Sequence, residues 1–373
     1  MEKPKRRLPD GAAVALGLVI LLAAGVWALL CRGGEFSEQE RRYLADFPGT
    51  PDVSAWKTDR ETERFLADHI PARGALVAAD SGVRLLTGRN SELEAWVVDG
   101  SVVEPPVKAD PAAIEKKLSR FAKVAEAAGA PWVLLTPRTH GWLLREKMTG
   151  VMARAFEEER ENYDLLDACP NAAAMPEAFF SEPEKMYYRT DHHWTLEGAY
   201  QAYLALAEPL GYEPAEPARF RVSEYGGFRG TTLSRSGLPP LWQDTLVCAE
   251  PDSAVTMTAA DREGETKSNR LIFPERAEDW DGYAVYLDGN HGTLVIERPD
   301  APEGTLVVYK DSMANCLLPL LSMHFRRIVA VDARYDAGVF TDALARAGEA
   351  RAVLYVYSLD SLVNDTEIIR KAR

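Results

Sequence analysis

The chain has 373 residues, 46% of them hydrophobic, and carries a formal net charge of −14 at pH 7. A hydrophobic content of this size is normal for a packed globular protein, so a chain that is disordered throughout is excluded. The acidic balance, without any stripe of Lys and Arg, also excludes nucleic acid as a partner, because no basic surface is present to neutralise phosphates.

The four cysteines, Cys31, Cys169, Cys248 and Cys316, show neither CxxC nor Cys/His spacing. This excludes zinc-finger chemistry. Cys169 and Cys248 could form a disulfide outside the cell, but a domain of this size does not need one, and two free thiols are the favoured alternative.

The segment from Gly11 to Leu30 is uncharged and rich in Ala, Val, Leu, Ile and Gly. At about 1.5 Å per residue such a helix spans roughly 30 Å of hydrocarbon. Basic residues precede it and acidic residues follow it, so the positive-inside rule places the amino end in the cytoplasm. A cleaved signal peptide is the alternative, but the run is too long and Leu29-Leu30-Cys31 lacks a small-residue cleavage pattern. We expect a cytoplasmic tail over residues 1–10, a single-pass transmembrane anchor over 11–31, and the rest outside the cell membrane.

Residues 32–109 form a predicted juxtamembrane region and N-terminal extension. Helical spacing runs from Thr58 to Leu66 and is closed by Ile70-Pro71. Further along, the apolar run Glu94 to Val98 is followed by Asp99-Gly100, which suits a β-hairpin.

The main domain is predicted over residues 110–373. Apolar residues at helical spacing follow Asp110-Pro111 and precede a buried strand at Trp132 to Pro137. Later strands are expected at Thr305–Tyr309, Arg327–Val331 and Arg351–Tyr357, with helices over Met313–Phe325 and Val339–Gly348 between them. Strands as apolar as these are covered on both faces, so the pattern predicts an α/β fold with a mostly parallel sheet between helices.

A β-rich insertion is expected at about 220–300, where Gly, Pro, Thr and charged residues are frequent. Its clearest β-like runs are Tyr283–Leu287 and Thr293–Ile296.

Ser312 is the candidate nucleophile, because it stands where a predicted strand turns into a predicted helix. Ligands collect at the carboxyl ends of strands in open α/β sheets, and free N–H groups there can hold an oxyanion. The alternative is that Ser312 is only a helix N-cap.

A carboxylate and two imidazoles occur together in Tyr188-Arg189-Thr190-Asp191-His192-His193-Trp194-Thr195. In an extended run Asp191 and His193 project to one side and His192 to the other. His193 would take the proton of Ser312, and Asp191 would orient the imidazole. Thr195 is expected to cap a following helix.

A metal site formed by Asp191, His192 and His291 is a competing reading, and so is a purely structural role for the imidazoles. The chain has no HxxxH or HxH spacing, and the two adjacent imidazoles would point opposite ways. We therefore predict no metal and no cofactor.

The runs Thr190-Asp191-His192-His193-Trp194-Thr195 and Lys310-Asp311-Ser312-Met313-Ala314-Asn315 resemble the bacterial DHHW family. That family is similar to the SGNH-hydrolase-like alginate O-acetyltransferases and related exopolysaccharide acetylation proteins. The resemblance implies an SGNH-hydrolase-like (flavodoxin-like) three-layer sandwich in which Asp191, His193 and Ser312 form the triad in permuted order.

The same resemblance suggests oxyanion donors. Asn290, in Asp288-Gly289-Asn290-His291, is the best match to the family's Asn block, and Gly230 is a weaker match to its Gly block. Lys310 replaces the Gly of the standard G-D-S block, and Pro137-Arg138-Thr139 stands where the acetyltransferases have P-x-K.

Cations and aromatic rings near the predicted site are candidates for binding a sugar or its carboxylate. They are Arg138, Arg189, Trp194, Arg334 and Tyr335. Each of the arginines could instead form an ordinary buried ion pair, and a tryptophan is commonly a core residue.

The sequence thus predicts an extracytoplasmic serine-dependent O-acetyltransferase or O-acetyl esterase that acts on a cell-surface or secreted polysaccharide through an acyl-Ser312 intermediate. The resemblance also implies a multi-pass membrane acyltransferase as a partner. The alternative is a catalytically silent glycan-binding or scaffold protein of an acetylation complex.

Overall fold

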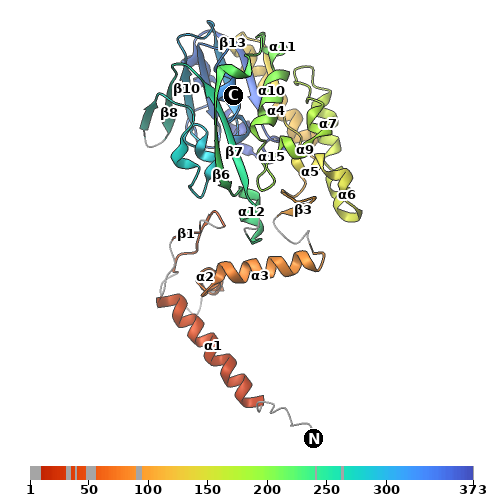
Figure 1. Ribbon diagram of the computed structural model, residues 1–373, viewed down its shortest axis with the longest axis vertical. Helices are drawn as coiled ribbons and strands as arrows, with labels where there is room; N and C mark the ends of the chain where they lie inside the picture. The colour runs from red at the N-terminus through yellow and green to blue at the C-terminus, as the bar shows by residue number, and fades with distance from the viewer. Residues whose placement is uncertain are drawn as a thin grey trace. The chain divides into compact units, whose positions relative to one another are not determined.

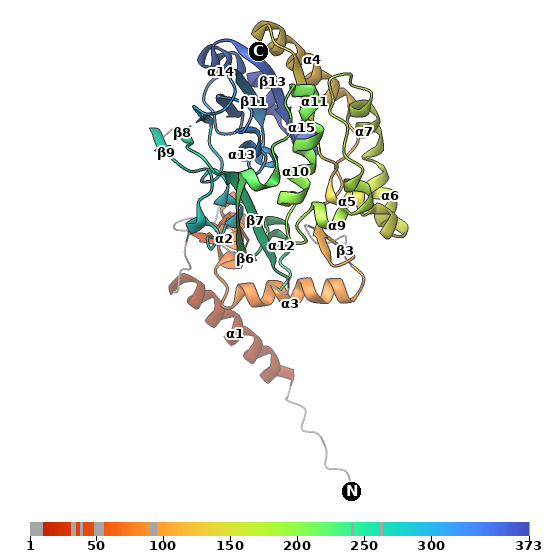
Figure 2. The same ribbon diagram turned by 45° about the horizontal axis from the view of Figure 1, so that its top comes forward.

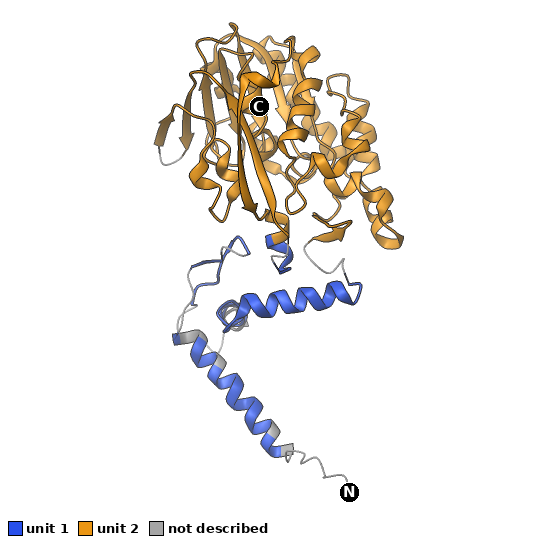
Figure 3. Ribbon diagram, in the orientation of Figure 1, with its two compact units in different colours: residues 1–89, 234–239 blue, residues 90–233, 240–373 orange. Residues whose placement is uncertain are grey.

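The computed structural model describes residues 10–30, 35–37, 40–47, 56–89, 95–239, 242–261 and 264–372. The chain divides into two compact units, an N-terminal unit (residues 1–89 and 234–239) and a main unit (residues 90–233 and 240–373), which are coloured separately in Figure 3.

The N-terminal unit contains three helices and a short hairpin: α1 (Asp10–Leu30), α2 (Trp56–Asp68), α3 (Arg73–Leu86), β1 (Phe36–Ser37) and β2 (Arg42–Tyr43). The predicted helix near Thr58 to Leu66 is α2. Its last residue, Asp68, accepts hydrogen bonds from the Arg42 guanidinium and from the backbone N–H of Ala45. These bonds tie the hairpin to the end of α2.

A helix, α1, also forms where the anchor is predicted. Within the described residues, no helix meets the combined length and apolarity needed to cross a bilayer. The prediction that residues 11–31 span a membrane thus has no support from the structure.

The main unit is built on a seven-stranded sheet in the order β5-β13-β11-β12-β10-β8-β9. Its strands are β5 (Trp132–Leu135), β8 (Thr256–Asp261), β9 (Gly264–Ser268), β10 (Thr293–Glu297), β11 (Thr305–Lys310), β12 (Arg327–Asp332) and β13 (Ala350–Val356). The neighbours from β5 to β12 pair in parallel, as predicted, whereas β10, β8 and β9 add antiparallel strands at one edge.

Two hairpins stand apart from this sheet, β3 (Trp96–Val98) with β4 (Ser101–Val103) and β6 (Phe220–Phe228) with β7 (Asp244–Pro251). The first is the predicted hairpin. Its turn residues Asp99 and Gly100 both have positive φ, 48° and 77°, as a tight two-residue hairpin turn requires.

The main unit also contains helices, most of which are labelled in Figures 1 and 2. They are α4 (Pro111–Ala128), α5 (His140–Leu143), α6 (Gly150–Glu157), α7 (Arg160–Asp167), α8 (Ala178–Ser181), α9 (Pro183–Met186), α10 (Leu196–Ala205), α11 (Ala207–Leu210), α13 (Leu318–Leu321), α14 (Phe340–Ala347), α15 (Leu359–Asn364) and α16 (Thr366–Lys371), while α12 (Thr231–Ser236) crosses the division between the units.

Successive side chains of β11 project to opposite faces of the sheet, and those from Leu306 to Lys310 are all buried. Tyr309 stacks on Tyr355 and donates its hydroxyl to the carbonyl of Phe340 in α14. The next residue, Lys310, projects to the other side because successive strand residues alternate. Lys310 lies close to Asp332 and Asn315.

Two predicted elements in the C-terminal half are wrong. Residues 313–325 do not form one helix: a 3-10 helix, η6 (Ser312–Ala314), precedes the short α13, and Pro319 sits in the first turn of α13, where it cannot donate a backbone hydrogen bond to a preceding turn. The run Tyr283–Leu287 is not a strand, because it contains the 3-10 helix η5 (Gly282–Val285) and Leu287 has φ of 62°. Within the predicted insertion at about 220–300, β8, β9 and β10 belong to the central sheet, and β6 and β7 form the hairpin described above.

Candidate active site

A chain of hydrogen bonds joins Asp191, His193 and Ser312. The Nε2 atom of His193 lies 2.9 Å from Ser312 Oγ, and its Nδ1 atom lies 2.6 Å from Asp191 Oδ1. Asp191 is fully buried and His193 is 5% exposed, so water competes little for these bonds. This is the order of nucleophile, base and orienting acid that activates a serine hydroxyl.

The position of Ser312 follows from how β11 ends. Asp311 is the N-cap of η6, and its Oδ1 accepts the backbone N–H of Met313 at 2.9 Å. The capping role that was the alternative for Ser312 is therefore filled by its neighbour, which leaves the Ser312 hydroxyl to His193.

Asp311 is itself held firmly. Its other oxygen, Oδ2, accepts from Ser358 N and Ser361 Oγ at 2.8 and 2.7 Å. Burial alone would raise the pKa of Asp311, but the nearby Arg334 charge and these hydrogen bonds outweigh burial and lower it. A charged Asp311 therefore keeps the turn that presents Ser312.

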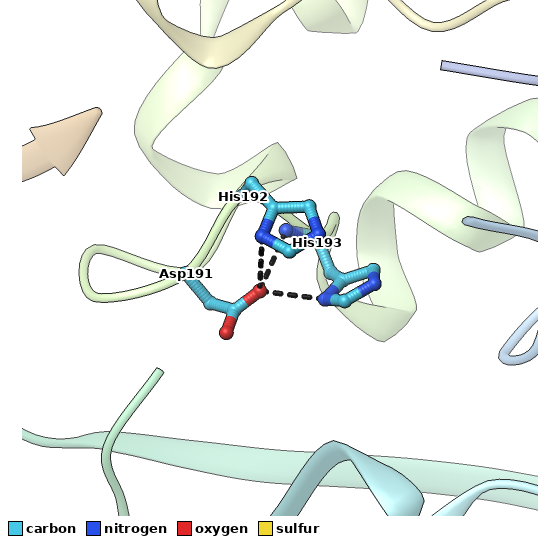
Figure 4. Close-up of side chains that lie close together, drawn as sticks. All are labelled: Asp191, His192 and His193. Carbon is cyan, nitrogen blue, oxygen red and sulfur yellow. Dashed lines mark hydrogen bonds and ion pairs between the residues drawn. The ribbon is translucent and has the colours of Figure 1, made fainter. Parts of the chain in front are cut away.

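The segment that carries Asp191 and His193 is bent rather than extended. Its ends are joined by hydrogen bonds from Tyr188 N to His193 O (3.3 Å) and from Thr195 N to Met186 O (2.8 Å). The prediction that His192 points away from its neighbours is wrong for this reason. In Figure 4 both imidazoles lie beside the same carboxylate oxygen, with His192 Nδ1 3.4 Å from Asp191 Oδ1.

Gly230 supports this segment sterically and does not serve as an oxyanion donor. Its N–H donates to Thr190 Oγ1 at 3.0 Å, so the predicted oxyanion role is wrong. A Cβ at this position would lie 2.2 Å from Thr190 O and 2.4 Å from Asp191 Cβ. The next residue, Thr231, donates its N–H to Asp191 Oδ2 at 2.5 Å, which fixes the second carboxylate oxygen.

Asn290, the other predicted oxyanion donor, is linked to the turn of Ser312. Its Oδ1 accepts from Asn315 Nδ2 at 3.1 Å. Within the described residues, its own Nδ2 has no hydrogen-bond partner, and neither does the backbone N–H of Ser312. These two donors therefore remain available to a ligand.

His193 is electrostatically prepared to be neutral. Burial and, to a smaller extent, the neighbouring His192 lower the pKa of His193, Asp191 opposes both effects, and the net pKa is about 4. A neutral imidazole at pH 7 has the free lone pair that a general base needs.

Tyr283 is a site residue that the sequence did not reveal. Its ring stacks on the His193 imidazole at a centroid distance of 3.7 Å and an interplanar angle of 7°. The tyrosine face is negative, so this stacking favours a positive imidazolium when one forms. No sequence signal pointed to it, because the run around it has the apolar pattern of a strand.

Lys310 and Asp332 lie side by side under the site, at the ends of β11 and β12. Lys310 Nζ is 3.8 Å from Asp332 Oδ2, and both side chains are essentially unexposed. Burial lowers the pKa of Lys310, while Asp332 opposes this change. Arg334 also binds Asp332, through Nε (2.9 Å) and Nη2 (2.7 Å).

The predicted substrate-binding residues are spread over different environments. Arg138 is 7% exposed and binds both carboxylate oxygens of Asp167, at 2.5 and 2.6 Å. Trp194 is fully buried and its Nε1 donates to Cys316 Sγ at 2.7 Å, so the predicted stacking of this ring on a sugar is wrong. Arg334 is partly exposed and lies over the ring of Tyr335, a residue that is 42% exposed.

Arg189 lines a cavity of about 800 Å³ together with residues of α10 and of the β6–β7 hairpin. It donates to the carbonyl of Gln243 and lies 3.5 Å from Asp244 Oδ1. Of the described residues that line this cavity, none belongs to the Asp191–His193–Ser312 chain. The cavity is therefore a neighbour of the site and not the site itself.

In the part of the chain that the structure describes, the cluster with ligand atoms close enough to hold a metal is Asp191, His192 and His193. His291, proposed for the alternative metal reading, instead contacts Asp261 Oδ2 at 2.7 Å and Leu287 O at 3.0 Å. Cys169, Cys248 and Cys316 are free thiols.

A part of the chain that contains the candidate triad matches a known protein family. The model of the DHHW protein family matches residues 177–331. The match contains Asp191, His193 and Ser312, and it confirms the resemblance noted in the sequence. No curated protein matches the sequence.

Among solved structures, the chain is similar to a DHHW family protein from Eubacterium siraeum, with 20% identity and a TM-score of 0.62 over 74% of this chain and 94% of that one. Bacillus cereus PatB1 with a sulfonyl adduct has 20% identity and a TM-score of 0.62, over 75% of this chain and 100% of that one. The O-acetyltransferase domain of Pseudomonas putida AlgJ has 13% identity and a TM-score of 0.40, over 74% of this chain and 98% of that one. The first two likenesses show a shared mixed α/β fold.

Proposed function

We propose that this protein is a serine-dependent O-acetyltransferase or O-acetyl esterase that acts on a polysaccharide. The observation that carries the proposal is the contact of 2.9 Å between His193 Nε2 and Ser312 Oγ, made by an imidazole whose other nitrogen faces Asp191. A buried, neutral imidazole in this position has no evident structural need for a serine hydroxyl, but it has a direct chemical use for one.

In the proposed reaction, Ser312 Oγ attacks the carbonyl carbon of an acetyl ester and its proton passes to His193 Nε2. The imidazolium is stabilised by Asp191 and by the face of Tyr283. The oxyanion is held by Asn290 Nδ2 and by the backbone N–H of Ser312. Collapse expels the donor's alkoxide, which takes the proton from His193 and leaves acetyl-Ser312. A sugar hydroxyl or water then attacks this ester, loses its proton to His193, and regenerates Ser312 by the reverse steps.

The choice of acetyl as the transferred group and of a polysaccharide as the acceptor rests on the resemblance to the DHHW family. Bacillus cereus PatB1 carries a sulfonyl adduct, and a sulfonyl reagent is therefore a suitable second probe of Ser312. We further propose that the protein acts outside the cell membrane with its amino end in the cytoplasm, as the charges flanking residues 11–30 indicate. A multi-pass membrane acyltransferase would supply its acetyl groups.

The test is covalent capture on the full chain with 4-nitrophenyl acetate, followed by intact-mass measurement. We expect one acetyl adduct, absent in Ser312→Ala and retained in a control, Ser223→Ala, on the β6–β7 hairpin. Phenylmethylsulfonyl fluoride should block the same residue. If the wild-type chain gains no adduct and cleaves no ester, the alternative is favoured, namely a scaffold or glycan-binding protein that keeps the fold without the activity.

A further inference from the structure

Lys310 replaces the glycine of the usual nucleophile block, and its surroundings suggest why a buried cation stands there. Its Nζ donates to Asn315 Oδ1 at 2.7 Å. Asn315 is 1% exposed, and on its other side Nδ2 faces Asn290 Oδ1 at 3.1 Å and the carbonyl of Gly289 at 3.5 Å. Three side chains therefore form a line from the end of β11 to the loop that carries Asn290.

The polarity of this line is fixed at both ends of Asn315. Lys310 Nζ donates a hydrogen bond to the amide oxygen of Asn315, which fixes that end of the amide. A backbone carbonyl can only accept, so Gly289 must face the amide nitrogen. Asn315 therefore has one orientation that satisfies both neighbours, although the two ends of an amide have nearly the same shape.

That orientation is passed on to Asn290. Because Asn315 presents an N–H donor, Asn290 must turn its oxygen toward Asn315, and its own Nδ2 then faces away. In the proposed function Asn290 Nδ2 donates to the oxyanion, and a flipped Asn290 would instead offer a carbonyl oxygen that repels the developing negative charge.

We propose that Lys310 and Asn315 are positioning residues that lock the amide of Asn290 with its nitrogen toward the oxyanion. The proposal rests on the proposed acyl-transfer function. It gives Lys310 a role that a glycine in the same block could not fill, and it makes Asn315 a switchable element: a carboxylate there would still accept from Lys310 but could no longer donate to Asn290.

The decisive variant is Asn315→Asp. It keeps an oxygen that accepts from Lys310, but it replaces the N–H donor that faces Asn290 by a second carboxylate oxygen. We expect the rate of Ser312 acetylation by 4-nitrophenyl acetate to fall about 100-fold or more, as in Asn290→Ala, since each loses one oxyanion donor. KM for the ester should stay constant, because the lost interaction belongs to the transition state. Lys310→Met, which removes the fixed donor at similar length, should show a smaller loss in the same direction.

The control is the double variant. Once Asn290 is alanine, no amide remains for Asn315 to orient. Adding Asn315→Asp should then lower the acetylation rate by less than about threefold. A merely structural role would cost the same rate with or without Asn290, and that result, or a wild-type rate in Asn315→Asp, overturns the proposal. Thermal unfolding of each variant checks that it is folded.

Two further outcomes distinguish a failure of the positioning role from a failure of the proposed function. If Ser312→Ala abolishes acetylation and Asn290→Ala does not change its rate, the positioning role is wrong and the proposed function stands. If Ser312→Ala is still acetylated at the wild-type rate, the proposed function itself fails.

Discussion

Acid inactivation of the site can be worked out from the burial of His193. Its pKa falls from 6.5 to about 4, mainly through burial and then through the charge of His192. At about 1.4 kcal/mol for each tenfold change, this corresponds to roughly 3 kcal/mol in favour of the neutral imidazole. Because only the neutral form accepts the Ser312 proton, activity is present above the pKa and is lost as the pH falls through it. We expect half-maximal kcat/KM near pH 4, and not near 6.5.

The assay is stopped-flow acetylation by 4-nitrophenyl acetate after a brief jump to each pH. A return to pH 7 before a second measurement excludes acid unfolding as the cause. His192→Gln is the matched variant: without the charge of His192, the pKa of His193 should rise and the half-maximal point should move to higher pH. A wild-type profile centred near pH 6.5 would refute the reasoning, because it would mean that the base titrates as if it were in water.

Three other substitutions test the support of the site and of the fold. Gly230→Ala would place a methyl group against Thr190 and Asp191, so we expect slower acetylation and a loss of about 1–3 kcal/mol of stability; Gly226→Ala, where a Cβ has nothing within 4 Å, should leave both unchanged. Tyr283→Leu should lower kcat several-fold by removing the ring on His193, whereas Tyr283→Phe should retain most activity because it keeps the ring. Lys117 donates to the carbonyls of Ser361, Leu362 and Val363, so Lys117→Met should destabilise the fold by about 1–3 kcal/mol in thermal unfolding without changing the activity of folded molecules; the exposed Lys116→Met is its control.

The hydrogen-bonded chain at the site was predictable because each of its parts has a local signal. Asp191 and His193 are two residues apart in a segment without helical spacing, so they were expected on one side of the chain. Ser312 follows an apolar strand, and the carboxyl ends of parallel strands lie at one edge of a sheet, where ligands bind. What the pattern could not show was the bend that brings His192 to the same carboxylate, because an alternating rule applies only to extended backbone.

The predictions for Gly230 and Trp194 were wrong, and Tyr283 was missed, because each depends on contacts between residues that are distant in the sequence. A glycine can be needed for its free N–H or for its missing Cβ, and only the position of Thr190 against Gly230 distinguishes the two. A tryptophan next to the Asp191–His193 pair can face solvent or the core, and Trp194 faces the core. Tyr283 is contributed by a segment almost a hundred residues from His193, and long-range contacts of this kind leave no periodicity to read.

The hydrogen bonds around Asp191 favour the proposed triad over a metal site. Asp191 Oδ1 accepts the backbone N–H and the Nδ1–H of His193, and Oδ2 accepts the N–H of Thr231. A metal ion would have to displace these donors, and it would also need the His193 Nδ1 lone pair, which is absent while that nitrogen carries the proton facing Asp191. Each of these bonds instead serves a carboxylate that orients an imidazole, and the nitrogen left over points at Ser312. Two of the three residues that suggest a metal by composition, Asp191 and His193, are thus hydrogen-bonded as the proposed proton relay to Ser312 requires.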